Sequence, residues 1–370
     1  MTIKLRVLHV FGLLNRGGAE TMIMNLYRQI DRDKIQFDFV VHSTLEGDYD
    51  KEIKELGGNI YNLPKYTILN HFQYKKEWNT FMREHPEISI IHTHVRSSAS
   101  VFLKIAKSHN IPTIAHSHST SNGGGIQGFV KNITQFPIRF IADYFFSASD
   151  KAGVWLFGKK IVNNVNYSVL NNAIKSEDYI FNQNQRDTIR NELGIQNKFV
   201  IGHVGRFHES KNHFFLLDIF KEIYETNKES ILMLVGDGLL KEDVVNKISR
   251  MNLTKNVLLM GVRDDVNKLM QAMDVFVFPS KFEGLPVTVI EAQATGLPVV
   301  LSDQITKEVS ITELTKFISI DKEANVWKNE ILNSYNRVER KNMEKEIIKS
   351  GYDVKTTVIK LQNFYLKISK

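Results

Sequence analysis

The sequence Phe278-Pro-Ser-Lys-Phe-Glu-Gly-Leu-Pro-Val-Thr-Val-Ile-Glu-Ala292 joins a predicted strand, residues 274–278, to a predicted helix. Pro286 suits the first position of that helix, because this position needs no backbone N–H donor. Two carboxylates bracket the turn: Glu283 lies on the loop after the strand, and Glu291 lies about one and a half turns into the helix. The stretch therefore predicts a polar crevice at the carboxyl end of a parallel strand.

The backbone of the same turn offers hydrogen-bond donors. The N–H groups of Gly284, Leu285 and Val287 lie at or before the first helical turn, where no helical acceptor exists. A helix amino terminus attracts phosphate, and carboxylates beside it can bind sugar hydroxyls. The pattern thus favours a nucleotide-sugar site over the alternative, which is an ordinary loop acid and a solvated helix acid.

The five residues from Phe282 to Pro286, with the second glutamate that follows them, resemble the signature of glycosyltransferase family 4. These are retaining enzymes of the GT-B fold. The resemblance implies an α/β protein with two Rossmann-like, doubly wound domains that face each other across a cleft. It implies an acceptor-binding domain at residues 1–170, a nucleotide-sugar-binding domain at 171–351, and a C-terminal helix, 352–370, that returns to the first domain.

Length and composition agree with two domains. The chain has 370 residues, 42% of them hydrophobic, and strands alternate with helices in both halves. It has no cysteine, which excludes disulfides and thiol catalysis. The sequence shows no signal-peptide pattern and no apolar run long enough to span a membrane, so we expect a cytoplasmic protein.

The net charge of +7 favours an anionic partner, which could be nucleic acid, a membrane surface or a phosphate-bearing substrate. Nucleic acid is the weakest of the three, because no basic arm, zinc finger or RNA-recognition signature is present. The segment 65–78 mixes basic and aromatic side chains and predicts peripheral contact with the inner face of the membrane, or a lipid-acceptor surface. The alternative is a helix with a buried aromatic face.

Glycines follow the first predicted strand, residues 5–11. Gly17 and Gly18 would permit a close approach to a ligand, although a tight turn with a helix cap explains them equally well. The family resemblance implies that this loop lies over the phosphates of the donor. A second flexible loop, Ser121–Gly125, predicts a lid at the acceptor site.

Two predicted strands in the first half each end in His-x-His, with His92 and His94 on one and His116 and His118 on the other. Parallel strands would bring both pairs to the same edge. Four imidazoles leave zinc open as an alternative, although no carboxylate of fitting spacing accompanies them. The resemblance implies that His116 is the active-site histidine, with His118 in reserve and with His92 and His94 on the acceptor side. It also implies that no metal is needed.

The second half supplies cations. Arg206 and Lys211 follow a predicted strand that ends at Gly205. The resemblance implies that this pair holds the donor diphosphate and stabilises the leaving group, for which a planar guanidinium and a compact ammonium are suited.

Two further strand ends contribute to the expected donor site. Gly236 follows one predicted strand, and Gly261, Val262 and Arg263 follow the next. The resemblance implies that the second of these loops contacts the nucleobase mainly through backbone atoms. With Gly17, Gly18, Gly205, Gly284, Leu285 and Glu291, they complete the predicted donor-binding set.

The resemblance implies transfer of a hexose or N-acetylhexosamine from a nucleoside diphosphate sugar, with UDP expected, to a lipid-linked or oligosaccharide acceptor in exopolysaccharide or capsule synthesis. Glu283 would hold the sugar hydroxyls and Glu291 the ribose diol, while the leaving phosphate takes the acceptor proton. No cofactor is expected. Two alternatives stay open: a nucleotide-sugar epimerase of the same fold, and a non-catalytic sugar-nucleotide-binding subunit of a polysaccharide assembly complex.

Overall fold

The computed structural model of the chain describes residues 4–118 and 131–369. The chain forms two compact units, Met1–Ala173 with Asp353–Lys370 and Ile174–Tyr352. The predicted bounds, 170/171 and 351/352, differ from these by three residues and by one. The predicted lid loop Ser121–Gly125 lies outside the described residues.

The first unit is built on a parallel sheet of seven strands in the order β3-β2-β1-β4-β5-β6-β7. The strands are β1 (Leu5–Phe11), β2 (Ile35–Val41), β3 (Ile60–Asn62), β4 (Ile88–Thr93), β5 (Thr113–Ser117), β6 (Tyr144–Ser147) and β7 (Tyr167–Val169). The central strands are buried on both faces, as their nearly continuous apolar sequences require. Strand order reverses between β1 and β4, where open α/β sheets place their ligands.

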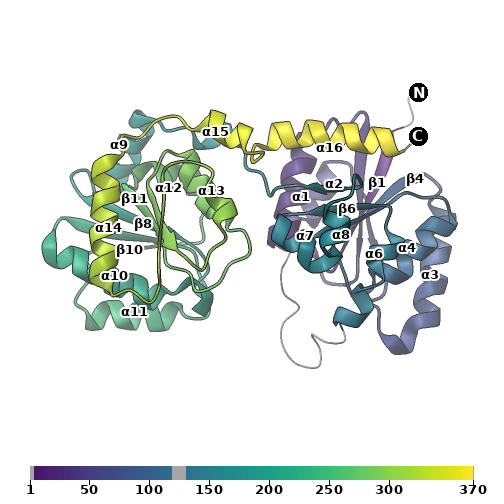
Figure 1. Cartoon of the computed structure of the whole chain (residues 1–370), viewed down its shortest axis with the longest axis horizontal. Coiled ribbons are helices and arrows are strands. Elements are labelled where there is room, and N and C mark those ends of the chain that lie inside the picture. Colours follow the sequence, from purple (N-terminus) through teal and green to yellow (C-terminus); the bar gives the residue numbers. More distant parts are fainter. Residues whose placement is uncertain (1–3, 119–130, 370) are drawn as a thin grey trace. The chain divides into compact units, whose positions relative to one another are not determined.

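Helices cover both faces of this sheet (Figure 1). They are α1 (Gly18–Gln29), α2 (Asp50–Glu55), η1 (Ile68–Asn70), α3 (His71–Glu84), α4 (Ala99–Ser108), α6 (Ile138–Ile141), α7 (Asp150–Phe157), α8 (Lys159–Val162) and α16 (Val354–Ile368). One face packs against α1, α2 and α16, and the other against α3, α4, α6 and α7.

The C-terminal helix α16 returns to the first unit, as expected, and lies beside α1 (Figure 1). Val358, Leu361 and Tyr365 recur at helical spacing and are buried against the first sheet. Burial of this apolar stripe, rather than chain proximity, places the helix there, because α16 follows the whole second unit in sequence.

The second unit is a parallel sheet of six strands in the order β10-β9-β8-β11-β12-β13. The strands are β8 (Phe199–Val204), β9 (Ser230–Val235), β10 (Val257–Gly261), β11 (Val275–Phe278), β12 (Val299–Ser302) and β13 (Thr315–Ile318). The helices are η2 (Ser176–Tyr179), α9 (Gln183–Leu193), η3 (Glu209–Lys211), α10 (His213–Thr226), α11 (Lys241–Arg250), α12 (Val266–Ala272), α13 (Val287–Ala294), η4 (Lys307–Val309), α14 (Ala324–Arg337) and α15 (Glu344–Lys349). Helices α9, α12, α13 and α15 pack on one face, and α10, α11 and α14 on the other.

The start of β11 is fixed by a buried carboxylate. Asp274 accepts hydrogen bonds from Arg190 Nη2 at 2.6 Å and from the backbone N–H of Val200 at 2.7 Å, and it pairs with Arg186. These partners compensate the cost of burying its charge. They anchor the strand that leads into the Glu283 turn.

The helix after that turn begins one residue later than predicted. Pro286 is the residue before α13, with φ −74° and ψ 105°, and Val287 is the first helical residue. The extended ψ angle keeps Pro286 out of the helix, so its position as the first helical residue was wrong.

Candidate functional site

Lys211 and Glu283 form the central contact of the second unit's site. Lys211 Nζ lies 2.7 Å from Glu283 Oε1 and 4.6 Å from the centroid of the Phe278 ring. Both side chains are largely buried, with exposed fractions of 16% and 14%. The pair joins the loops after β8 and β11, which are neighbouring strands. A charged pair in this setting is held more firmly than one in open water.

The loop that carries Lys211 is folded tightly onto the sheet edge. A Cβ atom at Gly205 would lie 3.1 Å from His203 Nε2 and 3.2 Å from Lys211 Cδ. Asn212 adopts a left-handed backbone, with φ 58°, and donates to the Pro279 carbonyl at 3.2 Å. These contacts fix the loop, while the Arg206 side chain is exposed and makes no ion pair within the described part of the chain.

Glycines allow the neighbouring loops to close on this edge. Gly236 has φ +135°, and a Cβ atom there would lie 2.2 Å from the Gly205 carbonyl oxygen. Its N–H donates to the Gly261 carbonyl at 2.8 Å. Gly261 itself has φ +66°, a conformation that favours glycine. The structure thus brings the predicted glycines Gly205, Gly236 and Gly261 together.

Val262 and Arg263 follow on the same loop. Val262 is exposed, as a residue that contacts a ligand must be. Arg263 donates twice to the Asp265 carboxylate, at 2.7 Å for each bond, and this carboxylate raises the pKa of Arg263. The Arg263 guanidinium is therefore already engaged within its own loop.

The turn before α13 keeps the predicted donors available. Among the described residues, no acceptor lies opposite the N–H groups of Gly284, Leu285 and Val287. Gly284 is exposed and has no atom within 4 Å of a Cβ position, whereas the Leu285 side chain packs on the core. An anion can approach this turn without displacing a protein acceptor.

Glu291 has a partner that sequence reasoning missed. Tyr179 OH donates to Glu291 Oε1 at 2.8 Å, and burial raises the pKa of Glu291. Burial and the neighbouring Glu291 raise the pKa of Tyr179 well above its ordinary value. Tyr179 lies in η2, 112 residues before Glu291 in sequence, so no local motif marks it.

Five histidines meet at the carboxyl edge of the first sheet. His9 Nδ1 lies 3.0 Å from His94 Nε2, and His94 Nδ1 lies 2.8 Å from His118 Nε2. His92 Nε2 lies 3.2 Å from His116 Nδ1. The structure therefore brings the four predicted histidines together and adds His9. Its pairing with His92 across β1 and β4 is a signal that only the strand register reveals.

Burial keeps these imidazoles neutral at pH 7. Desolvation lowers the pKa of all five, and it lowers the pKa of His9 and of His118 to about 3. A neutral imidazole offers one donor and one acceptor, so the rings can satisfy one another. The chain of rings ends at α16, where the Tyr365 hydroxyl lies 2.6 Å from His92 Nδ1.

The histidines differ in exposure. His116 is buried, with 1% of its surface exposed, and its Nε2 has no partner among the described residues. His94 and His118 are only partly buried. The His118 ring also packs against His116, with the ring centroids 3.9 Å apart and the ring planes tilted by 32°. Of the two candidates for the active-site histidine, His118 is the more accessible.

Two histidine triads have a spacing that could hold a metal ion. The ligand atoms of His9, His92 and His94 lie within 4.8 Å of one another, as do those of His94, His116 and His118. Three imidazoles form a known zinc ligand set. In this structure the rings form hydrogen bonds with one another instead, and the prediction that no metal is required stays a prediction.

The glycine loop after β1 is shaped by a side chain of α1. A Cβ atom at Gly17 would lie 2.3 Å from Glu20 Oε2, whereas Gly18 has open space around its Cβ position. Burial raises the pKa of Glu20. A Cβ atom at Gly17 would displace only the end of the flexible Glu20 side chain, and Gly18 leaves room at the surface.

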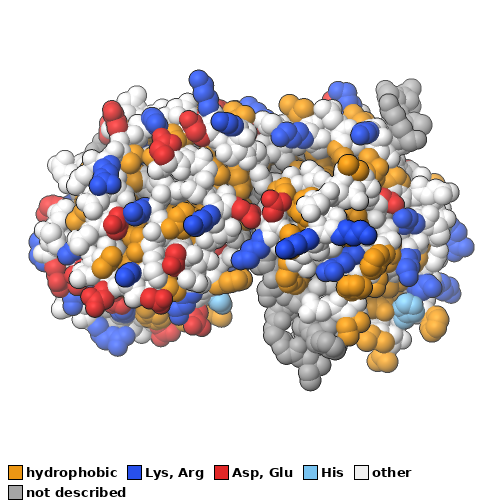
Figure 2. Space-filling view, viewed as in Figure 1, with side chains coloured by type: hydrophobic (Ala, Val, Ile, Leu, Met, Phe, Trp, Pro, Cys, Tyr) orange, Lys and Arg blue, Asp and Glu red, His pale blue; other side chains and the backbone are white. Residues whose placement is uncertain are grey.

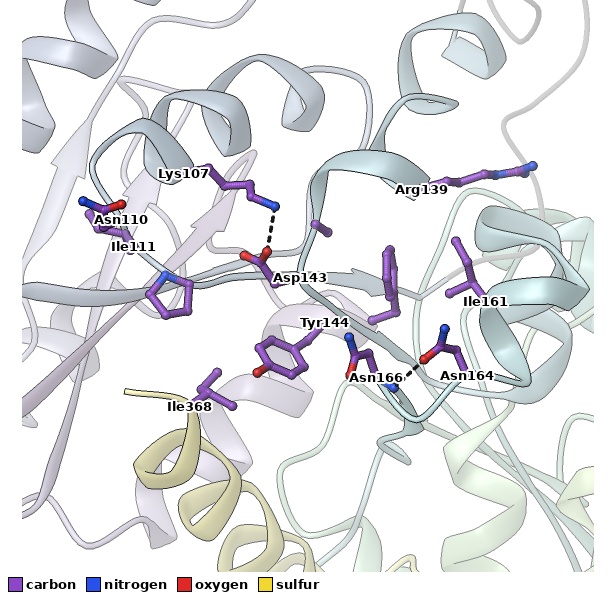
Figure 3. Close-up of a pocket in the computed structure, with 13 residues that line it drawn as sticks. Lys107, Asn110, Ile111, Arg139, Asp143, Tyr144, Ile161, Asn164, Asn166 and Ile368 are labelled. Carbon is purple, nitrogen blue, oxygen red and sulfur yellow. Dashed lines mark hydrogen bonds and ion pairs between the residues drawn. The ribbon is translucent and has the colours of Figure 1, made fainter. Parts of the chain in front are cut away.

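A hollow in the first unit lies away from these residues (Figure 3). It has a volume of about 690 Å³ and lies where β5, β6 and β7 begin, at the opposite edge of the sheet from the histidines. Lys107 and Asp143 form an ion pair of 2.7 Å across it. The hollow is therefore separate from the candidate site.

Known proteins share both the sequence and the fold. Residues 16–165 match the family model "Glycosyltransferase Family 4", and residues 198–336 match "Glycosyl transferases group 1". EpsF of Bacillus subtilis (strain 168), which carries a glycosyltransferase name, is 35% identical over 97% of this chain and 96% of its own. The capsular polysaccharide biosynthesis glycosyltransferase CapH of Staphylococcus aureus is 24% identical over 98% and 99%.

Among solved structures, Anabaena Alr3699/HepE in complex with UDP and glucose has a TM-score of 0.76 at 18% identity, covering 98% of this chain and 100% of that one. The two parallel-sheet units and this likeness define a GT-B fold. The chain belongs to glycosyltransferase family 4, as the identity to EpsF over nearly its whole length shows. No described helix is long and apolar enough to cross a membrane.

Proposed function

We propose that this glycosyltransferase moves a hexose or N-acetylhexosamine from a UDP-sugar to a lipid-linked or oligosaccharide acceptor, with retention at the anomeric carbon. The observation that carries the proposal is the Lys211–Glu283 pair, 2.7 Å apart, beside the turn before α13, whose N–H groups have no acceptor in the described part of the chain. One ammonium, one carboxylate and a set of backbone donors provide complementary partners for a diphosphate and a sugar.

Each residue then has a distinct role. Arg206 and Lys211 stabilise the negative charge that develops on the departing diphosphate. Glu283 accepts hydrogen bonds from sugar hydroxyls, and Glu291, oriented by Tyr179, accepts them from the ribose diol. The leaving phosphate oxygen takes the proton of the acceptor hydroxyl, so no protein carboxylate has to serve as base.

For the first unit we propose His118, rather than His116, as the histidine that contacts the transferred sugar. His118 is partly exposed, whereas His116 is buried beneath it. A neutral His118 can donate to or accept from a hydroxyl, and its Nε2 contact with His94 fixes the ring. His92 and His116 then act as positioning residues behind the two accessible rings.

Relatives support the acceptor class. An Escherichia coli relative, 33% identical over 50% of this chain and 54% of its own, is named as a galactosyltransferase that uses UDP-Gal and a diphosphoundecaprenol-linked GlcNAc. CapH is named for capsular polysaccharide biosynthesis. These names support a lipid-linked acceptor and a role in exopolysaccharide or capsule synthesis.

The first test is thermal unfolding with UDP, GDP and their sugars, without added metal. We expect one nucleotide family to raise the midpoint, and Arg206→Ala and Glu291→Ala to abolish this shift. Lys281→Ala, a change at an exposed lysine of the loop that also carries Glu283, should leave the nucleotide-dependent shift intact. An absence of any shift in the wild-type protein would contradict the donor site.

Turnover distinguishes the alternatives. With donor and a prenyl-diphosphate sugar, a transferase forms UDP and an extended lipid. An epimerase forms a new sugar nucleotide without acceptor, and a non-catalytic subunit binds nucleotide without forming any product. Mass spectrometry of the reaction separates the three outcomes.

A further inference from the structure

An exposed apolar surface lies on the first unit, formed by residues 65–76 and 131–141. Large hydrophobic side chains project from both segments, and these are Ile68 (71% exposed), Leu69 (99%), Phe72 (85%), Ile133 (58%), Phe136 (49%) and Phe140 (76%). Single exposed hydrophobic residues are ordinary, but a group of six on two neighbouring segments is not. We call this group, with the cations around it, the apolar-basic surface.

The side chains are displayed by a rigid turn. Asn70 N donates to Thr67 Oγ1 at 3.2 Å, and Thr67 N donates to Asn70 Oδ1 at 2.7 Å, so each residue caps the other around η1. Tyr66 OH lies 3.0 Å from His71 Nδ1. The chain thus holds Ile68 and Leu69 outward in a fixed conformation.

The helix that follows this turn, α3, also has an apolar face that is buried in the core. In α3, Tyr74 and Trp78 have no exposed surface, and Trp78 stacks on Phe102 with the ring centroids 4.6 Å apart. The alternative expected from the sequence, a buried aromatic face, is therefore correct for these two residues. It does not explain Leu69 and Phe72, which lie outside that face.

Helix α4 connects the two segments. A groove of about 530 Å³ is lined by Tyr66 and His71 from the first segment, by Ser100 and Lys104 from α4, and by Pro137 from the second. Ser100 Oγ also donates to the Thr134 carbonyl at 3.2 Å. The two segments therefore belong to one continuous surface.

This surface is predominantly basic, and Glu77, which accepts a hydrogen bond from Gln73 Nε2 at 2.8 Å, lies at its margin. Residues 65–76, 99–108 and 131–141 contain no Asp or Glu, and their cations are Lys65, Lys75, Lys76, Lys104, Lys107, Lys131 and Arg139. Lys107 pairs with Asp143 outside these segments. Figure 2 shows hydrophobic and basic side chains next to one another at the lower end of this unit. Apolar tips surrounded by lysines complement an anionic lipid surface, which offers both acyl chains and phosphates.

We propose that the apolar-basic surface docks this protein on an anionic bilayer, with Ile68, Leu69 and Phe72 inserted at the headgroup boundary and the lysines on lipid phosphates. Apolar insertion alone, or electrostatic attraction alone, is not sufficient for stable attachment. The apolar-basic surface supplies both. Attachment does not depend on the donor nucleotide, so it can be tested separately from the proposed transfer reaction.

The test is co-sedimentation of the full chain with vesicles of phosphatidylglycerol and phosphatidylethanolamine, compared with vesicles of phosphatidylcholine. We expect binding to the anionic vesicles alone, weakened by salt. The double variant L69E/F72E should lose about 100-fold or more in partitioning, because two large apolar side chains are replaced by charges. V165E changes another fully displayed residue of this unit, 97% exposed, and should bind like the wild type.

A second pair of variants isolates the charge. K75A/K76A should lose about 25-fold in partitioning, since each lysine near an anionic surface contributes about fivefold. K159A/K160A removes an equally exposed lysine pair elsewhere in the unit and should lose much less. The nucleotide-dependent shift in unfolding temperature, measured on every variant, shows that the fold and the donor site are intact.

Three outcomes would overturn the proposal. One is that the wild type binds neither vesicle, and another is that L69E/F72E and V165E bind equally well. The third is that the wild type does not bind vesicles and that L69E/F72E abolishes self-association or the binding of another protein. This result would make the surface a protein interface.

Discussion

The carboxyl edges of the two sheets have the same topology and opposite chemistry. The first edge carries five neutral imidazoles, three buried and two partly buried, that form hydrogen bonds with one another. The second carries the Lys211–Glu283 ion pair, the exposed Arg206 and a turn whose N–H groups have no acceptor within residues 4–118 and 131–369. Neutral rings suit sugar hydroxyls, whereas cations and N–H donors suit a diphosphate. A parallel sheet thus fixes where ligands bind, and side chains at the strand ends fix which ligands.

The largest expected difference between the two edges is in their response to acid. Burial lowers the pKa of the five histidines at the first edge, to about 3 for His9 and His118, so the unfolded chain binds protons first as pH falls below about 6.5. Stability is therefore lost between about pH 6.5 and pH 3, by up to about 1.4 kcal/mol per pH unit for each histidine. In the second unit, burial likewise lowers the pKa of His203 and His213, which are two residues against the five at the first edge.

Tryptophan fluorescence can separate the units. Trp327→Phe leaves Trp78 and Trp155, which report on the first unit, and W78F/W155F leaves Trp327, which reports on the second. We expect the denaturant midpoint of the first unit to fall more steeply from pH 7 to pH 5. If the midpoints of the two units fall equally with pH, the pKa values of the five imidazoles are not lowered in the folded protein.

The second prediction concerns the charged edge. Lys211→Ala should lower kcat about 10²–10³-fold, because it removes a positioned cation from the developing charge on the diphosphate. The rate of UDP release with donor and acceptor measures this loss. Lys281→Ala serves as the control, since Lys281 is exposed and pairs with Glu209 at 3.2 Å. An equal loss in both variants would mean that general electrostatics, and not the Glu283 pair, supports turnover.

The third prediction tests the backbone beneath that edge. Gly236→Ala should lower the free energy of unfolding of the second unit by about 2–4 kcal/mol, since φ is +135° and the new methyl would lie 2.2 Å from the Gly205 carbonyl oxygen. Gly284→Ala should change it by less than about 0.5 kcal/mol, because no atom lies within 4 Å. Denaturant unfolding of the two variants measures the contrast, and similar losses would refute the close approach of the loops.

The smallest expected effect is at Tyr179. Tyr179→Phe removes the 2.8 Å hydrogen bond to Glu291 and should raise the donor KM about five- to tenfold with little change in kcat. Steady-state kinetics with varied donor measure both constants. Tyr335→Phe alters an exposed tyrosine of the same unit and should change neither. A fall in kcat at constant KM would place Tyr179 in the chemical step and not in binding.

The sequence by itself determined the fold class and which residues follow the strands of the second sheet. Alternating strands and helices predict parallel sheets, and parallel sheets collect the residues after each strand at one edge. Glu283 and Glu291 could therefore be selected from the turn and helix that carry them, whereas Arg206 and Lys211 were assigned from the family resemblance. The family assignment rests on the same residues, and the relatives confirm it.

Tertiary structure alone decided which of these groups touch one another. The pairing of Lys211 with Glu283, the bond from Tyr179 to Glu291 and the entry of His9 into the imidazole chain each join segments distant in sequence. The fold also buries His116 and leaves His118 accessible. In the same way it leaves Leu69 exposed and places Trp78 in the core. Strand register and helix packing set such contacts, and neither is encoded in any short stretch of the chain.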